Sequence, residues 1–230
     1  MSVRSLVIIF LMTSFSVKAQ QATPVAGLPL ATYAASTNDT SKPVIVYYTG
    51  DGGFNSFSTS FAKQLNSKGY NIVSFNSLKY FWRTKTPEQA AADAIQVIEY
   101  AQKTYNRKRF VLIGYSFGAD VMPFIFNRLP KRLQVDTKYM VLMSPSTHTD
   151  FTVHVTELLG RNNKGSSNIP EEINKITGIP LLIIAGEKEE GGLNTSSLTI
   201  PNIHKLIIPG GHHYDSDPSF VVNTIINYLH

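Results

Sequence analysis

The sequence predicts an α/β fold in which a mostly parallel central sheet carries helices on both faces, with a small lid segment. Runs of β-branched and aromatic residues without polar alternation, such as PVIVYY (43–48) and RFVLIGY (109–115), are typical of strands buried on both faces. Helical stretches alternate with these runs, which is the order that right-handed βαβ units produce. The chain of 230 residues is long enough for one well-packed core.

The expected elements follow one another along the whole chain. We predict strands, the first at an edge and the others buried, at 28–34, 43–48, 70–75, 109–115, 138–145, 179–186 and 203–210. We predict helices at 58–69, 86–105, 117–129 and 218–229. Thr86 is the expected N-cap of the second helix, with Pro87 in its first turn, and Gly69 ends the first helix. Residues 146–178 lack a clear crossover helix, so we expect them to form the lid.

The first 19 residues have the pattern of a secretory signal peptide. Arg4 gives a basic start, an apolar stretch runs from about Leu6 to Met12, and Val17-Lys18-Ala19 gives a small-residue cleavage site. The apolar stretch is shorter than the roughly 18–20 residues that a membrane-spanning helix needs. We therefore expect cleavage after Ala19 and a single mature domain over residues 20–230.

The composition excludes several kinds of protein. Hydrophobic residues make up 43% of the chain and charged residues 16%, which is a globular balance. There are no cysteines, so disulfides and thiolate zinc sites are excluded. Removal of the signal peptide takes away Arg4 and Lys18 and leaves 19 basic against 16 acidic residues. This excess predicts no nucleic-acid binding, and it leaves room for peripheral contact with an anionic membrane surface.

The motif GYSFG (114–118) lies between a predicted strand and the helix that follows it. A sharp turn at this place strains the backbone of its central residue, and glycine at 114 and 118 relieves the crowding beside it. The turn then presents the Ser116 hydroxyl at the edge of the sheet. The alternative is a glycine-rich turn with a capping serine, but the strand–turn–helix context favours a nucleophile.

A serine nucleophile needs a base, and the base needs an acid to orient it. In this architecture the three follow in the order serine, acid, histidine. The loop after the strand at 179–186 reads EKEEGG (187–192), where Glu189 is the expected acid and Glu190 the alternative. The loop after the last strand reads GGHHY (210–214). His212 fits the position of the base, and His213, one residue later, points the other way on an extended loop.

The developing oxyanion needs two backbone donors. The Phe117 N–H, at the start of the helix after Ser116, is one candidate. The turn TGDGGF (49–54) follows the first buried strand, and the Asp51 N–H is the second candidate, with Gly52 as its alternative. No Walker lysine follows this turn, which argues against a phosphate loop for a nucleotide.

The chain resembles the bacterial VirJ/AcvB family of α/β-hydrolase-fold proteins. The resemblance rests on YTGDGGF, SLKYFWRTKTPEQAAAD, LIGYSFGADVMPFIFNRLP and GGHHYD, and it spans most of residues 43–216. It implies a periplasmic serine hydrolase, linked to virulence and secretion, that acts on aminoacylated phosphatidylglycerol, chiefly the lysyl form. It also supports Ser116 as the nucleophile, the GGHHY site as the base and Glu189 as the acid.

A substrate of this kind joins a cationic amino acid to a lipid headgroup through an ester. Three carboxylates are expected to attract its ammonium groups: Asp51, Asp120 and Glu190. The aromatic side chains of Tyr80, Phe81 and Trp82 are candidates for an apolar or cation–π wall, with core packing as the alternative. The stretch DFTVHVTELLG (150–160) is expected to be a lid helix, with contact to a membrane surface as its alternative.

Two other classes of function remain to be weighed. A degenerate hydrolase scaffold would serve as a periplasmic binding or chaperone-like protein, although a complete set of serine, acid and histidine argues against it. A metalloenzyme is disfavoured because none of the six histidines has H-E-x-x-H or similar ligand spacing. We therefore predict neither a metal nor another cofactor, and the sequence does not indicate an oligomeric state.

Overall fold

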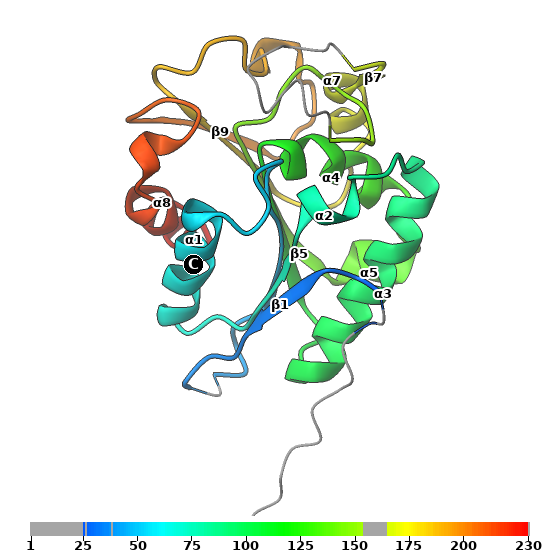
Figure 1. Ribbon diagram of the computed structural model, residues 1–230, viewed down its shortest axis with the longest axis vertical. Helices are drawn as coiled ribbons and strands as arrows, with labels where there is room; N and C mark the ends of the chain where they lie inside the picture. Colours follow the sequence, from blue (N-terminus) through cyan, green and yellow to red (C-terminus); the bar gives the residue numbers. More distant parts are fainter. Residues whose placement is uncertain (1–24, 26, 38, 154–164, 230) are drawn as a thin grey trace, which may run out of the picture.

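The central feature of the computed structural model is one seven-stranded sheet with helices on both faces (Figure 1). The structure describes residues 25, 27–37, 39–153 and 165–229, so the predicted signal peptide lies outside the described residues. In spatial order the strands are β1 (Leu30–Tyr33), β3 (Ile72–Phe75), β2 (Val44–Tyr48), β4 (Phe110–Tyr115), β5 (Thr137–Met143), β8 (Leu181–Gly186) and β9 (Ile203–Ile208).

The strand register brings the loops of interest to one edge of the sheet. β2, β3, β4, β5, β8 and β9 pair in parallel, so all of them end at the same edge. β1 pairs antiparallel with β3, and Leu30 lies opposite Phe75. The residues before β1 therefore lie at the same edge as the residues that follow the parallel strands. Ligand sites of such sheets gather at this carboxyl edge.

The helices of the described residues divide between the two faces of the sheet. α1 (Ser56–Ser67) and α8 (Ser219–Leu229) cover one face, where Phe61 and Ile225 join the same buried cluster. α3 (Pro87–Tyr105) and α4 (Phe117–Asn127) cover the other face. α2 (Ser77–Tyr80) and α5 (Lys131–Asp136) are short helices that the sequence did not predict. In the described part of the chain, no helix has the length and apolar character needed to cross a membrane.

Local capping explains where α3 and α1 begin. The Thr86 side chain accepts a hydrogen bond from the Gln89 N–H, and the Gln89 side chain accepts one from the Thr86 N–H, which completes a capping box. Pro87 follows as the first residue of α3, as predicted. α1 begins two residues before its predicted start because the Asn55 side chain caps it. Gly69 follows α1 with a φ of +87°, which glycine adopts readily.

The segment that we expected to be a lid without a helix contains three short elements. β6 (His148–Thr149) and β7 (Ser167–Asn168) pair antiparallel, and α7 (Ile169–Ile173) follows them. Residues 154–164, which include most of the predicted lid helix at 150–160, lie outside the described residues.

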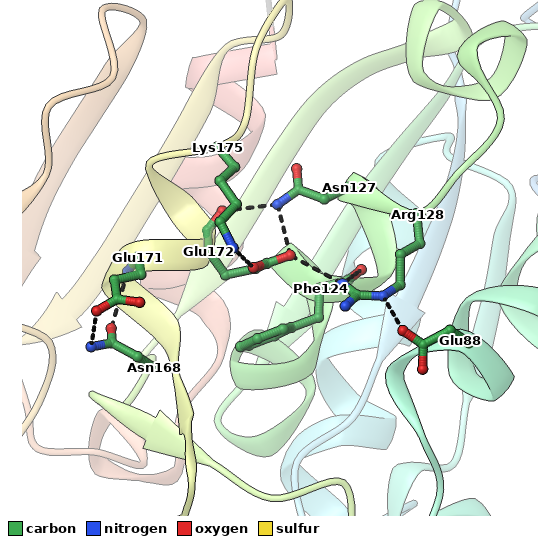
Figure 2. Close-up of polar contacts among 8 residues, drawn as sticks. All are labelled: Glu88, Phe124, Asn127, Arg128, Asn168, Glu171, Glu172 and Lys175. Carbon is green, nitrogen blue, oxygen red and sulfur yellow. Dashed lines mark hydrogen bonds and ion pairs between the residues drawn. The ribbon is translucent and has the colours of Figure 1, made fainter.

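A buried carboxylate fastens α7 to α4, as Figure 2 shows. Only 6% of the Glu172 side chain is exposed, and it accepts hydrogen bonds from Asn127 at 3.1 Å, Arg128 at 3.1 Å and Lys175 at 2.7 Å. Glu88 on α3 accepts a further bond from Arg128 at 2.9 Å. Burial opposes ionisation of Glu172, but the bonds from Lys175 and Asn127 hold its pKa below the ordinary value. A buried charge that is paired in this way fixes the position of α7.

The last strand is not buried, contrary to our expectation. β9 is an edge strand, and four of its six residues are exposed, including Leu206 and Ile207. Its first and last residues, Ile203 and Ile208, still pack against the two cores. An apolar run alone does not distinguish an edge strand from a central one, because it does not show whether a second neighbouring strand pairs with it.

Candidate active site

The turn at residues 114–118, here called the elbow, joins β4 directly to α4. Ser116 has φ +50° and ψ −119°, a strained conformation for a residue other than glycine. Its N–H donates to the Met143 carbonyl at 2.8 Å, and its carbonyl accepts from the Ala119 N–H at 2.8 Å. The strained residue is therefore held from both sides, by β5 and by the first turn of α4.

The two glycines of the elbow are required by close backbone packing. A Cβ atom at Gly114 would lie 2.5 Å from the carbonyl oxygen of Gly118. A Cβ atom at Gly118 would lie 2.3 Å from the Tyr48 carbonyl oxygen and 2.6 Å from that of Thr49. All three distances are below 3.0 Å, which real Cβ atoms essentially never show. The pattern G-x-S-x-G thus has the steric origin that the sequence suggested.

A chain of hydrogen bonds runs from the elbow to the loops after β8 and β9. The Ser116 Oγ lies 2.8 Å from His212 Nε2, and His212 Nδ1 lies 2.6 Å from Glu189 Oε1. The structure thus brings together the three side chains that the sequence nominated, in the order serine, histidine, acid. The neutral imidazole accepts from one neighbour and donates to the other only if the proton is on Nδ1.

The electrostatics of the pair favour a charged imidazole facing a carboxylate. Burial raises the pKa of Glu189, but hydrogen bonds from His212 and Ser144 outweigh this effect and leave the pKa below its ordinary value. Burial lowers the pKa of His212, whereas the hydrogen bond and charge of Glu189, with the charges of Asp120 and Asp51, raise it above its ordinary value. Glu189 therefore stabilises the imidazolium that forms when His212 takes a proton.

Sequence reasoning missed the groups that hold Glu189. Its Oε2 accepts a hydrogen bond from the Gly186 N–H at 3.2 Å, and the Ser144 hydroxyl also lowers its pKa. Ser144 is fully buried with φ +50°, and its Oγ lies 2.8 Å from the Tyr214 hydroxyl. That hydroxyl donates to the Ile184 carbonyl at 3.2 Å. A serine among the last residues of the predicted strand at 138–145 was the available signal, since the end of this strand falls at the same edge as Ser116.

The second histidine has a separate place. His213 Nδ1 lies 2.7 Å from the Tyr115 hydroxyl, which also approaches the carbonyl of His212 at 3.3 Å. The two imidazole rings are nearly perpendicular, at 79°. His213 therefore fastens the loop after β9 to Tyr115 of β4. Of the two histidines, His212 is the one that contacts Ser116.

The turn after β2 lies against the elbow. A Cβ at Gly50 would lie 3.3 Å from Ser116 Cβ, which shows how closely the turn approaches the serine. Asp51 follows Gly50 and is half-buried. Phe117 is the first residue of α4, and the N–H groups of a first helical turn have no acceptor within the helix. The two predicted oxyanion donors thus belong to segments that adjoin Ser116.

Two of the predicted substrate carboxylates have different surroundings. Asp120 is 6% exposed, and its Oδ1 accepts a hydrogen bond from the Ser146 N–H at 2.7 Å. It therefore holds the segment after β5, and its charge raises the pKa of His212, while its small exposed fraction leaves little of the carboxylate open to a substrate. Glu190 is exposed on the loop after β8, one residue past the carboxylate that His212 contacts.

The aromatic wall also differs from its predicted form. Tyr80 is buried and donates its hydroxyl proton to Asp93 Oδ2 at 2.6 Å, and Phe81 is fully buried against Phe117, with ring centroids 5.1 Å apart. Core packing, the alternative, holds for these two. Trp82 is 57% exposed and lines a separate cavity together with Tyr80. The cavity is described below. Among the described residues, no group of three or more His, Asp or Glu side chains is arranged to hold a metal ion.

Comparison with known proteins places the chain in a family. The family model described as bacterial virulence protein (VirJ) matches residues 42–230. No curated protein sequence matches the chain.

Solved structures with the same fold include several hydrolases. Est1E from Butyrivibrio proteoclasticus is 17% identical, with a TM-score of 0.65 over 90% of this chain and 95% of that one. Proline iminopeptidase from Mycobacterium smegmatis is 13% identical, with a TM-score of 0.64 over 87% and 93%. Carboxylesterase CesB from Bacillus subtilis is 14% identical, with a TM-score of 0.58 over 87% and 86%. At these identities the likeness establishes an α/β-hydrolase fold.

Proposed function

The chain belongs to the VirJ family of bacterial virulence proteins, and from this premise we propose that it is an exported serine hydrolase that cleaves a carboxylic ester. The proposed substrate is an aminoacylated phospholipid of the lysyl-phosphatidylglycerol type. One observation carries the proposal: Ser116 Oγ, His212 and Glu189 form a continuous hydrogen-bonded chain, with contacts of 2.8 Å and 2.6 Å, at a strained elbow. Such a chain activates a hydroxyl that is otherwise a poor nucleophile.

In the first half of the reaction, Ser116 Oγ attacks the ester carbonyl carbon. His212 Nε2 takes the hydroxyl proton, and Glu189 stabilises the resulting imidazolium through Nδ1. The carbonyl oxygen becomes an oxyanion, which the N–H groups of Phe117 and Asp51 are proposed to bind. The bond between the carbonyl carbon and the headgroup oxygen then breaks, and the imidazolium gives its proton to the departing alcohol.

In the second half, water resolves the acyl-enzyme. His212 takes a proton from the water as its oxygen attacks the acyl carbon. The bond to Ser116 Oγ breaks, and the imidazolium returns the proton to the serine. The products are a free amino acid and the headgroup alcohol of the lipid, and the protein returns to its starting protonation state.

The charge around the triad supports a cationic acyl group. The side chain of Asp51 is half-buried on the turn that contacts the elbow, and its charge helps to raise the pKa of His212. Glu190 is exposed on the loop that carries Glu189. A lysyl group carries two ammonium charges, and carboxylates at these positions favour it over a neutral acyl group.

The proposal is tested by labelling and by lipid chromatography. A fluorophosphonate probe should label the protein at Ser116, and the Ser116→Ala variant should take up no label. Ser74→Ala is the matched control, because it removes a serine hydroxyl of β3 that has no partner in the described structure, and it should keep the label. Intact wild-type protein that takes up no label would contradict the serine mechanism.

The substrate is identified by incubating wild type and Ser116→Ala with lysyl- and alanyl-phosphatidylglycerol and with simple esters. Wild type should release the amino acid and phosphatidylglycerol, and Ser116→Ala should be slower by at least about 1,000-fold in kcat. Hydrolysis of simple esters alone would reject the lipid substrate. Export is tested separately by fractionating cells and sequencing the mature N-terminus, which should begin at Gln20.

The same variant distinguishes the binding or chaperone-like alternative. A protein of that class needs its surface but not its nucleophile, so Ser116→Ala would rescue a deletion strain. An enzyme requires the nucleophile, so we expect no rescue.

A further inference from the structure

A cavity of about 370 Å³ lies beyond the aromatic core next to the elbow. Its walls come from the segment before β1, from α2, from the connection between α2 and α3, and from α3; the residues are Gly27, Leu28, Pro29, Lys79, Tyr80, Trp82, Arg83, Lys85 and Asp93. The catalytic proposal uses none of the charged groups on these walls.

The cavity carries an excess of positive charge. Three cations line it, Lys79, Arg83 and Lys85, against the single carboxylate of Asp93. Among the ion pairs of the described residues, none involves these three cations. Asp93 accepts hydrogen bonds from two neutral groups, the Tyr80 hydroxyl and the Gln96 amide. The cavity thus has a net charge of +2 and cationic groups without a carboxylate partner.

The aromatic residues of the cavity suit the boundary between water and lipid. Trp82, the only tryptophan of the chain, is 57% exposed. The Lys85 ammonium group lies 4.8 Å from the centroid of the Tyr80 ring, which keeps it over the cavity wall. A half-exposed indole beside unpaired cations is the arrangement that anchors proteins at an anionic membrane surface.

The cavity lies at the same edge of the sheet as the candidate active site. Pro29 accepts a hydrogen bond from the Asn76 N–H at the end of β3, and Ser116 follows the end of β4. β2 alone separates β3 from β4. Two strand spacings correspond to about 10 Å, so the cavity and the elbow lie near one another along this edge of the sheet.

We propose that this cavity binds the phosphate group of an anionic phospholipid headgroup and so holds the protein on the membrane surface with the elbow facing the lipid. Lys79 and Arg83 contact the phosphate, Lys85 supports it from the wall, and Trp82 inserts at the level of the headgroups. This inference deepens the proposed function, because it explains how the protein would reach a lipid substrate, and only this biological role rests on the proposed function. Phosphate binding itself does not depend on the reaction at Ser116.

Intrinsic fluorescence gives a direct test, because Trp82 is the only tryptophan. The protein is titrated with vesicles of phosphatidylglycerol mixed into phosphatidylcholine and with vesicles of phosphatidylcholine alone. Wild type should bind the first kind at least tenfold more tightly, and the Trp82 emission should shift to shorter wavelength. Phosphatidylglycerol with brominated acyl chains should quench that emission.

Two double variants with the same change in net charge localise the binding. Lys79→Glu/Arg83→Glu reverses two cations of the cavity, and Lys63→Glu/Lys68→Glu reverses two exposed lysines on or directly after α1. The first should lose at least tenfold in affinity for the anionic vesicles, since one basic residue near such a surface contributes about fivefold. The second should stay within about twofold of wild type. Melting curves verify that both variants are folded.

Three results would overturn the inference. Equal losses in the two double variants would indicate diffuse attraction, and vesicle binding without any change in Trp82 emission would exclude the cavity. A saturable response to inorganic phosphate or sn-glycerol 3-phosphate without vesicle preference would assign the cavity to a soluble phosphate ester. Ser116→Ala should bind vesicles like wild type, so loss of hydrolysis with vesicle binding retained tests the catalytic proposal alone.

Discussion

The elbow and the terminal loops, which are residues 186–192 and 209–214, hold the two ends of the same hydrogen-bonded chain by different means. The elbow is fixed by backbone packing, because Gly114 and Gly118 leave no space for a Cβ. Close backbone packing also occurs at the start of the terminal loops, because a Cβ at Gly186 would lie 2.4 Å from the carbonyl oxygen of Gly211. A Cβ at Gly211 itself would meet nothing within 4 Å, and the neighbouring strand β9 is largely exposed. There, side-chain hydrogen bonds position Glu189 and His212. The nucleophile is thus placed mainly by backbone packing, whereas the base and acid, which lie beyond the packed start of their loops, depend more on polar side-chain contacts.

The largest expected effect is at the base. His212→Ala removes the group that takes the Ser116 proton, so kcat/KM for a soluble ester should fall by at least about 1,000-fold. His213→Ala removes only the contact with the Tyr115 hydroxyl and should remain within about tenfold of wild type. Steady-state kinetics of the two variants, made side by side, measure the difference. A larger loss in His213→Ala than in His212→Ala would show that His213, and not His212, is the base.

Two glycine substitutions test the contrast in packing. Gly118→Ala places a methyl group 2.3 Å from a backbone oxygen of β2, and this overpacking should lower the free energy of unfolding by about 3 kcal/mol, more than a hundredfold in the folding equilibrium. Gly211→Ala, beside the base, should change it by less than about 0.5 kcal/mol. Denaturant unfolding gives both values. Similar values for the two variants would remove the proposed difference between the regions.

A smaller loss of activity is expected when Glu189 keeps its charge but the neighbouring Ser144 hydroxyl is removed. Ser144→Ala deletes the hydroxyl that lowers the pKa of Glu189 and bonds to the Tyr214 hydroxyl, and loss of this polar support should lower kcat/KM by about tenfold. Ser74→Ala is the control, because this buried hydroxyl in β3 has no partner in the described structure. Unchanged kinetics in Ser144→Ala would show that Gly186 and His212 hold the acid without it.

The same contrast explains what could be predicted from the sequence. The elbow is local: five consecutive residues contain the steric constraint, and the strands around it are apolar runs. α3 is equally local, since Thr86, Pro87 and Gln89 specify its start within four residues. The loop positions of Glu189 and His212 followed from the fold class, because the carboxyl ends of parallel strands meet at one edge.

What could not be predicted depends on contacts between distant segments. Asp120 was taken for a substrate ligand, and only the fold shows that it accepts a bond from Ser146, 26 residues later. The Tyr80 hydroxyl donates a hydrogen bond to Asp93 on α3, 13 residues later. β6, β7 and α7 are too short to produce a hydrophobic period, and α7 is held by the contacts of Glu172 with α4.

The smallest expected effect is on pH dependence. It tests whether Asp120, on the helix that follows the elbow, acts on the base through its charge. Catalysis needs neutral His212, whose pKa is raised above the ordinary value of 6.5 by Glu189, Asp120 and Asp51 against the opposing effect of burial. The acid limb of kcat/KM should therefore lie above pH 6.5. Asp120→Asn removes one charge that stabilises the imidazolium and keeps an acceptor for Ser146.

The pKa of His212 should then fall, and the acid limb should move to lower pH. Activity at pH 6 should rise by less than about tenfold relative to wild type, while activity at pH 8 should barely change. Asp39→Asn is the control, because Asp39 precedes β2 at the opposite edge of the sheet and should leave the profile unchanged. A profile that stays in place in Asp120→Asn, or falls equally at every pH, would mean that Asp120 acts only by holding Ser146 and that the base depends on the terminal loops alone.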